Sequence, residues 1–399
     1  MTQRFLSHLN LSRDKIRFLF TGHIGCGKSS ELEHLRHVLT DSRSAQGRYF
    51  PVLLNASEYL DDYDAASADI LLAIVTEFAA TLRDKLAIDL QDNYFVKRFG
   101  ELKNLLTSDV EVKEGELSFG IAKTKVQLLK RDPTARHKVR EALEPKMSTM
   151  LEEINFIFDK ARIAIANAVA NTGDAPYRDF VLILDNLEKI QGFAKKDQGL
   201  ESQRELFLER APQLTGLDAH IIYTVPLQLA RSDGPQLKQR YGVEPFVLPM
   251  IKIIERGTRN TFPPGAASLR ALLQRHLGSL PLGQAFTEEA LGFLLKYSGG
   301  HARNLMTFVQ EACTYTDDIP IPLEAAHRAI QPTVRTYSTA IPDSHWNRLA
   351  QLDLSPDQKI DNGEKDYLSM LENLSVLEYM DGGKDDPFAL AEPWYAVNP

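Results

Sequence analysis

One eight-residue segment limits what this chain can fold into more than any other feature. Gly22-His23-Ile24-Gly25-Cys26-Gly27-Lys28-Ser29 matches the pattern G-x-x-x-x-G-K-[ST] at every fixed position. An apolar run at residues 16–21 precedes it, and apolar residues at helical spacing follow over 28–39. Strand, glycine-rich loop and helix is the setting that a phosphate-binding loop requires. The segment therefore predicts such a loop in an α/β fold.

The residue types of this loop suit a bound triphosphate. Glycine permits backbone angles and close approaches that a Cβ atom would block, and successive N–H groups at a helix N-terminus form a nest for anions. Lys28 is expected to neutralise the β- and γ-phosphates, and the Ser29 hydroxyl to bind Mg²⁺. We therefore expect ATP with Mg²⁺ to contact Gly22, His23, Ile24, Gly25, Cys26, Gly27, Lys28, Ser29 and Ser30.

Four further apolar runs predict the remaining strands of a five-stranded parallel sheet. They lie at residues 49–55, 180–184, 220–223 and 245–250, and helical patterns such as 70–82 separate them. Continuous apolar strands that alternate with helices indicate a parallel sheet covered on both faces.

Polar residues at strand ends are candidates for the chemistry. Asp185 ends the third run, where a carboxylate near the loop would hold Mg²⁺ through water, or would simply cap the next helix. Glu188 is either the base that orients the attacking water or a solvated helix residue. Thr224 ends the fourth run, and it either senses the γ-phosphate or caps a turn.

With these segments and Ser298–Met306 (SGGHARNLM), the chain resembles AAA+ ATPases, closest to the branch of origin-recognition initiators and STAND ATPases. The resemblance implies a helical lid whose sensor 2 arginine, Arg303, reaches the γ-phosphate; otherwise Arg303 is a surface residue. It also implies ATP hydrolysis. Asn186 stands where the family has glutamate, so hydrolysis is expected to be slow unless Glu188 replaces it. Arg240 is a weak candidate for an arginine finger in an oligomer, with Arg231 and Arg256 as competitors.

The patterns divide the chain into four parts. Residues 1–82 and 178–256 form the nucleotide-binding core, and 83–177 form a mainly helical insertion with a hairpin at 110–121. Residues 257–332 form the lid, and Pro263-Pro264-Gly265 marks the boundary near its start. Residues 333–399 read as helix, strand, glycine turn and strand, which resembles a winged helix.

Charge separates the classes of partner. The chain carries a net charge of −8, which does not suggest a dedicated nucleic-acid binder. Residues 333–399 hold twelve acids against five bases, whereas residues 123–140 hold seven bases against Asp132. The tail would repel DNA, and the basic segment is either a solvated helix face or a contact for phosphates or an acidic protein. The seven bases are Lys123, Lys125, Lys130, Arg131, Arg136, Lys138 and Arg140.

The sequence favours an ATP-dependent switch that regulates or assembles with a partner protein. By analogy, such a switch would act in bacterial antiphage defence. The alternatives are a DNA-associated initiator and a non-hydrolysing ATP-binding scaffold. Two distant cysteines and the lack of an apolar run of about 20 residues predict a cytoplasmic protein.

Overall fold

The computed structural model describes residues 1–41, 48–88, 126–170, 176–190, 199–258, 260–381 and 392–399. These residues form two compact units. The first contains Met1–Thr21 and Ser29–Phe246, and the second contains Gly22–Lys28 and Val247–Pro399. The predicted hairpin at 110–121 and the bases Lys123 and Lys125 lie outside the described residues.

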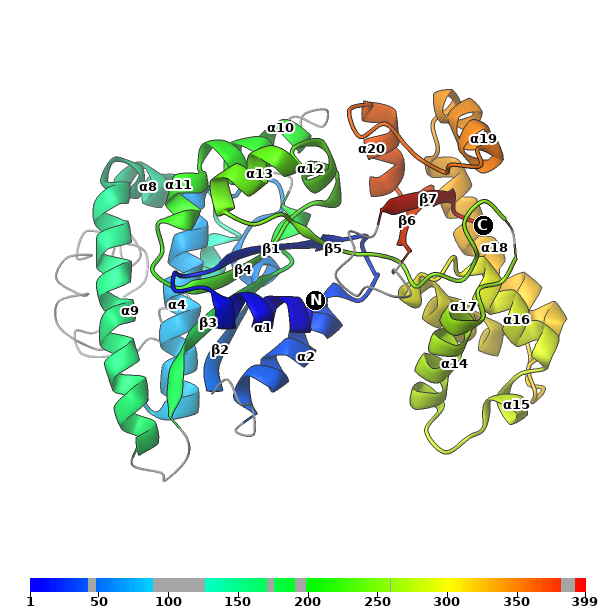
Figure 1. The fold of residues 1–399 in the computed structure, drawn as a ribbon, viewed down its shortest axis with the longest axis horizontal. Helices are drawn as coiled ribbons and strands as arrows, with labels where there is room; N and C mark the ends of the chain where they lie inside the picture. Colours follow the sequence, from blue (N-terminus) through cyan, green and yellow to red (C-terminus); the bar gives the residue numbers. More distant parts are fainter. Residues whose placement is uncertain (42–47, 89–125, 171–175, 191–198, 259, 382–391) are drawn as a thin grey trace. The chain divides into compact units, whose positions relative to one another are not determined.

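A five-stranded sheet organises the first unit, in the order β2-β3-β4-β1-β5 (Figure 1). β2 pairs in parallel with β3, β3 with β4, and β4 with β1. This confirms the predicted α/β fold with its parallel sheet. The strands are β1 (Arg17–Gly22), β2 (Arg48–Asn55), β3 (Tyr177–Asp185), β4 (His220–Thr224) and β5 (Phe246–Leu248).

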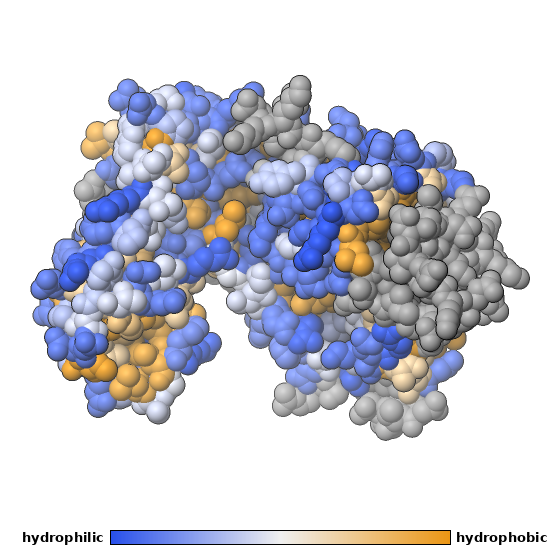
Figure 2. Space-filling view, turned by 180° about the vertical axis from the view of Figure 1, so that it is seen from behind, coloured by the Kyte–Doolittle hydropathy of each residue, from blue (hydrophilic) through white to orange (hydrophobic). Residues whose placement is uncertain are grey.

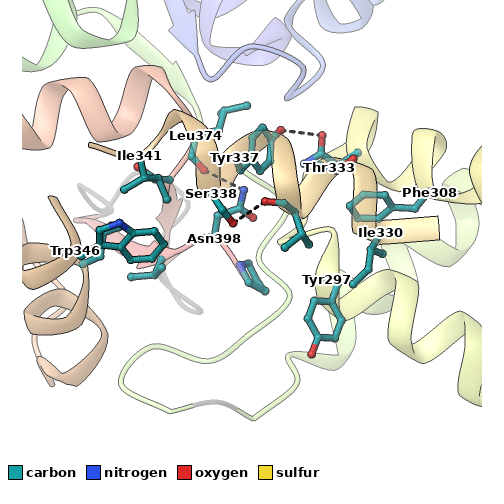
Figure 3. Close-up of a pocket in the computed structure, with 16 residues that line it drawn as sticks. Tyr297, Phe308, Ile330, Thr333, Tyr337, Ser338, Ile341, Trp346, Leu374 and Asn398 are labelled. Carbon is teal, nitrogen blue, oxygen red and sulfur yellow. Dashed lines mark hydrogen bonds between the residues drawn. The ribbon is translucent and has the colours of Figure 1, made fainter. Parts of the chain in front are cut away.

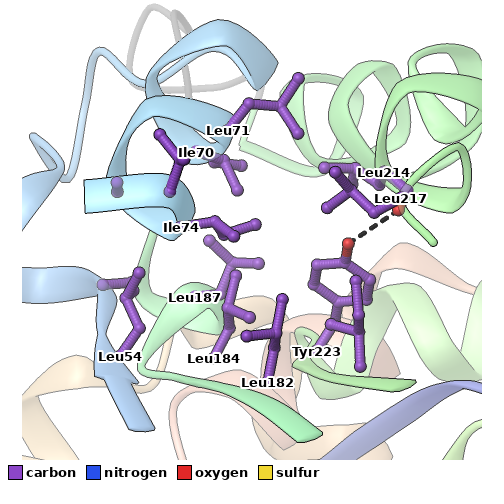
Figure 4. Close-up of a cluster of buried hydrophobic side chains, with 14 of the residues drawn as sticks. Leu54, Ile70, Leu71, Ile74, Leu182, Leu184, Leu187, Leu214, Leu217 and Tyr223 are labelled. Atoms are coloured by element: carbon purple, nitrogen blue, oxygen red, sulfur yellow. Dashed lines mark hydrogen bonds between the residues drawn. The ribbon is translucent and has the colours of Figure 1, made fainter. Parts of the chain in front are cut away.

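Successive side chains of a strand point to opposite faces of the sheet. Both faces are buried. Phe180, Leu182 and Leu184 of β3 pack into the main core with α4 (Ser67–Leu86) and α9 (Met147–Ala170). Figure 4 shows side chains of β3 and β4 facing α4 in this core. On the other side, Phe5 of α1 (Thr2–Leu11) meets Phe18 edge to face at 5.5 Å. Helix α1 was not predicted from the sequence.

Short helices complete the first unit. Pro145 lies in the 3-10 turn η1 (Glu144–Lys146) between α8 (Pro133–Leu143) and α9. The described part of the predicted insertion is therefore helical. The remaining elements are α2 (Lys28–Thr40), α3 (Ala56–Tyr59), η2 (Leu187–Lys189), α10 (Gly199–Arg204), the π-helical turn η3 (Glu205–Glu209), α11 (Ala211–Thr215), α12 (Leu227–Ser232) and α13 (Gly234–Tyr241).

Two of the predicted surface bases are internal. The Arg136 and Arg140 side chains are 4% and 5% exposed. Arg136 binds Asp64 through Nη2 at 2.6 Å, and Arg140 binds Asp69 through Nε at 2.8 Å and the Asp64 carbonyl at 2.6 Å. Burial raises the pKa of Asp69, and Arg140 opposes this rise. The two arginines thus join α8 to the start of α4, and they are not available to a phosphate backbone.

Helices and one hairpin build the second unit. Leu269, Leu294, Leu305 and other apolar residues of α14 to α18 share one core, as expected of the lid. Pro263 opens α14, because proline suits the first turn of a helix, where its missing N–H is not needed. The helices are α14 (Pro263–Leu277), α15 (Leu282–Ala285), α16 (Glu288–Tyr297), α17 (Ala302–Thr314) and α18 (Leu323–Ala340).

The tail adds η4 (Asp343–His345), α19 (Trp346–Leu354) and α20 (Lys365–Glu372) to an antiparallel pair, β6 (Val376–Met380) and β7 (Pro393–Val397). A cavity of about 150 Å³ lies among Tyr297, Phe308, Tyr337 and Trp346 (Figure 3). Some of its polar side chains are hydrogen-bonded within the protein: the Tyr337 hydroxyl donates to Asn304 at 3.2 Å, and Asn398 donates to the Leu374 carbonyl at 2.9 Å.

The described residues include no helix that is long and apolar enough to cross a membrane. Hydrophilic residues cover much of the face in Figure 2, and hydrophobic ones gather there in smaller areas.

A buried histidine lies at the amino ends of the strands. His220 accepts a hydrogen bond from the Ile16 N–H on Nδ1 at 3.2 Å, and its Nε2 lies 3.8 Å from Asp179. Burial lowers the pKa of His220 to about 4; Asp179 opposes this shift, and Lys15, Arg162 and Arg17 add to it. The folded chain therefore keeps this imidazole neutral.

Stability is expected to fall as the pH drops from about 6.5 towards 4, because the unfolded chain takes up a proton on His220 that the folded chain refuses. The full free energy of unfolding is available above about pH 6.5. Protonation of His220 in the unfolded chain lowers it by on the order of 3 kcal/mol as the pH falls to about 4. Urea unfolding at several pH values measures it. In His220→Asn, which keeps an acceptor for the Ile16 N–H, the slope between pH 6.5 and 4.5 should flatten. An equal slope in both proteins would contradict the assignment.

Candidate phosphate-binding site

The loop begins where β1 ends and finishes where α2 begins, as the sequence predicts. Gly22, Gly25 and Gly27 have φ angles of 152°, 85° and 107°, which L side chains rarely adopt. A Cβ atom on Gly25 would also lie 2.6 Å from the His301 ring. The Lys28 ammonium donates to the carbonyls of Gly22 and His23 at 2.9 and 3.1 Å. These bonds hold the lysine head over the loop.

Two histidines hold this loop through contacts with the lid and the tail. Neither contact was predicted from the sequence. His23 is 2% exposed, with Nδ1 3.1 Å from the Leu371 carbonyl and Nε2 accepting the Glu378 N–H at 2.9 Å. His301 is 1% exposed, with Nε2 2.6 Å from the Ile24 carbonyl and Nδ1 accepting the Asn304 N–H at 3.0 Å. A histidine inside the motif and another beside a glycine pair were the available signals.

Each tautomer follows from these partners. A ring nitrogen that accepts an N–H cannot carry a proton, so the proton of neutral His301 lies on Nε2 and is donated to Ile24. By the same argument, His23 carries its proton on Nδ1. Burial lowers the pKa of His301, with nearby Arg303 and Lys28 adding to the shift and the bond to Ile24 opposing it.

The strand ends of the first unit place the other candidates along one edge of the sheet. The register pairs Leu184 with Tyr223 and Thr224 with Phe20, so β1, β3 and β4 end together. Asp185 is 8% exposed, and its Oδ1 accepts the Asn186 N–H at 2.8 Å. This leaves Oδ2 without a hydrogen bond among the described residues. Ser29 lies in the first turn of α2.

Asn186 and Glu188 occupy a tight turn after β3. Asn186 is left-handed, with φ of 64°, and its amide donates to Asn55 at the end of β2 at 2.9 Å. Glu188 lies in η2, and its Oε2 is shielded from solvent. The residue after Asp185 is thus a turn residue, and Asn55 is a polar neighbour that the sequence reading omitted.

The Thr224 hydroxyl is occupied by backbone. It donates to the Leu184 carbonyl at 3.1 Å and accepts the Leu187 N–H at 2.9 Å, and the residue is fully buried. Both bonds tie β4 to the turn that carries Asp185 and Glu188. The geometry favours the structural alternative for Thr224, because a hydroxyl used in this way has little capacity left for a phosphate.

The arginine candidates differ in setting. Arg303 is exposed in the first turn of α17, and its Cβ lies 3.1 Å from the position of a Cβ on Gly25. Arg240 is exposed in the last turn of α13. Arg256 donates to the Asp357 carbonyl of the tail at 2.6 Å. Among these three candidates, only Arg303 has described contacts that place it beside the loop of its own unit.

No protein-family model matches the chain, and none of the curated proteins matches its sequence. Among solved structures it is similar to Orc1 of Aeropyrum pernix in complex with DNA, at 12% identity and a TM-score of 0.39 over 100% of this chain and 87% of that one. A Walker-type ATPase of Pyrococcus abyssi gives 14% and 0.42, over 100% and 92%. Drosophila ORC bound to DNA gives 10% and 0.39, over 100% and 83%.

Identities and TM-scores this low do not establish the fold or the function of the chain. The fold rests on the strand order and the phosphate loop of this chain.

Proposed function

We propose that this chain is an ATP-binding switch of the AAA+ kind, which hydrolyses ATP slowly and regulates or assembles with a partner protein. The observation that carries the proposal is the glycine loop with its left-handed turns, closed by the Lys28 ammonium at the N-terminus of α2. Backbone amides and one cation in this arrangement bind a phosphate chain. A role in defence rests on analogy alone.

The donor atoms suit magnesium. Mg²⁺ prefers hard oxygen ligands and keeps several waters. The Ser29 hydroxyl and the Asp185 carboxylate supply such oxygens, and they would hold the ion when it is bound, where it would offset phosphate charge. Arg303 would add a planar cation for the terminal phosphate. Glu188 would orient the attacking water.

The site tolerates a second reading. Asn186 serves as a turn amide bonded to Asn55, so the position beside Asp185 offers no base. This favours a scaffold that binds ATP without hydrolysing it. Turnover decides between the two readings.

Asp185→Asn is expected to lower magnesium-dependent ATP turnover at least about 100-fold, because the neutral amide no longer favours the cation. Glu188→Gln should lower turnover at least about tenfold while leaving the affinity for ATP nearly unchanged. Phosphate release measures turnover and calorimetry measures affinity.

Lys189→Gln is the control for both variants, because Lys189 is an exposed neighbour of Glu188 in the same turn. Its turnover and its affinity for ATP should match those of the wild type. Unchanged turnover in Glu188→Gln refutes the base assignment. No turnover in the wild type, with ATP bound, establishes the scaffold.

A further inference from the structure

Strand β6 of the tail contacts the phosphate loop through the His23 ring, and Cys26 of the loop packs against the apolar cluster that includes Leu377 and Tyr379 of β6. The His23 ring donates from Nδ1 to Leu371, in the last turn of α20, and accepts from the Glu378 N–H of β6. These atoms belong to one compact unit. The imidazole therefore ties a loop that binds phosphate to two elements of the tail at once.

β6 also contacts the lid at the turn before Arg303. The Tyr379 hydroxyl donates to the Gly299 carbonyl at 2.6 Å, and Leu377 would lie 2.5 Å from a Cβ on Gly299. The Glu378 carbonyl accepts the Met250 N–H at 2.9 Å. Gly299 has a φ of 58°, an angle that glycine adopts without strain, and a Cβ atom there would press on the Leu377 side chain.

The lid closes the connection by returning to the loop. His301, two residues beyond Gly299, reaches the Ile24 carbonyl through Nε2. The contacts thus run from loop to tail by His23, from tail to lid by Tyr379, and from lid to loop by His301. A change in the loop backbone at His23 or Ile24 would alter the contacts of both β6 and the turn before Arg303.

We propose that His23 is a positioning residue that couples the state of the phosphate loop to the docking of β6, so that the tail reports whether nucleotide is bound. The proposal rests on the proposed function, because it assumes that the loop binds ATP. His23 contributes its backbone to the loop and its side chain to the tail. It can therefore be changed without removing a backbone N–H or the lysine that binds phosphate.

Amide exchange of residues 376–380 in the full chain tests the coupling, with and without Mg-ATP. We expect Mg-ATP to change the protection of this segment in the wild type. In His23→Ala the segment should exchange at least about tenfold faster without nucleotide, and its response to Mg-ATP should be weaker than in the wild type. Exchange is compared at Mg-ATP concentrations that saturate each protein, so that any change in the affinity for ATP does not enter the comparison.

Two variants separate coupling from packing. His23→Gln places an acceptor near the former Nε2, so it should restore part of both the protection and the response. His34→Ala, on the exposed face of α2, should behave as the wild type. A β6 segment that answers Mg-ATP equally in the wild type and His23→Ala overturns the coupling, as does a wild type that binds ATP with no change in β6. A wild type that binds no ATP overturns the proposed function instead.

Discussion

Lys28→Met is expected to weaken the binding of Mg-ATP about 100-fold or more, with the fold retained. Methionine keeps most of the apolar stem and removes only the ammonium. A charge-assisted bond to a buried partner contributes about 2–5 kcal/mol, and each 1.4 kcal/mol is a factor of ten in affinity. The lysine is 6% exposed, so little solvent would screen the lost interaction. Calorimetric titration with Mg-ATP measures the change.

The control for this variant is Lys138→Met, an exposed lysine of α8, which should bind as the wild type does. Lys28 also donates to the carbonyls of Gly22 and His23, so its loss removes two hydrogen bonds of the loop. Urea unfolding of both variants shows whether stability changes as well. Equal affinities for ATP in Lys28→Met and the wild type would remove the basis of the proposed function.

Arg140→Met is expected to lower the free energy of unfolding by about 3–5 kcal/mol, because it strands the buried carboxylate of Asp69. Burial already raises the pKa of Asp69. Asp64 would lose bonds too: burial opposes its ionisation, but Arg140 and Arg136 outweigh burial and hold its pKa below the usual value. Chemical denaturation at pH 7 measures the loss.

Arg131→Met tests whether any base of this segment has the same effect. Arg131 is exposed, so its replacement should change stability by less than about 0.5 kcal/mol. Adding Asp69→Leu to Arg140→Met should recover part of the lost stability, since the stranded charge is then removed. An equal loss in Arg131→Met and Arg140→Met would refute a specific buried pair.

The same arginines bear on the DNA-associated alternative. A phosphate contact needs exposed cations, and Arg136 and Arg140 are bound to carboxylates. Of the described bases in the segment, Arg131 and Lys138 are exposed and Lys130 donates to the Ser57 carbonyl at 2.7 Å. Of the five described bases of the segment, two are therefore buried in ion pairs and two are exposed.

The sequence could predict the sheet and the loop because their signals are local. Apolar runs marked all five strands to within about three residues at their ends, and the glycine spacing marked the loop. The close approach of Gly265 to the Lys252 carbonyl left no signal in the sequence, because the two residues meet only in the fold. Thr224 kept two readings because its hydrogen-bond partners, Leu184 and Leu187, come from another strand and the turn after it.

What the sequence alone determined is therefore the phosphate loop with its strand and helix, since each glycine and the lysine act through their own backbone and immediate neighbours. Only the tertiary structure decided that Arg136 and Arg140 are buried, and that His23 and His301 hold the loop. Those roles depend on partners tens or hundreds of residues away, such as Asp64 and Glu378. A contact of that kind leaves no periodic trace in the chain, because folding alone brings its two sides together.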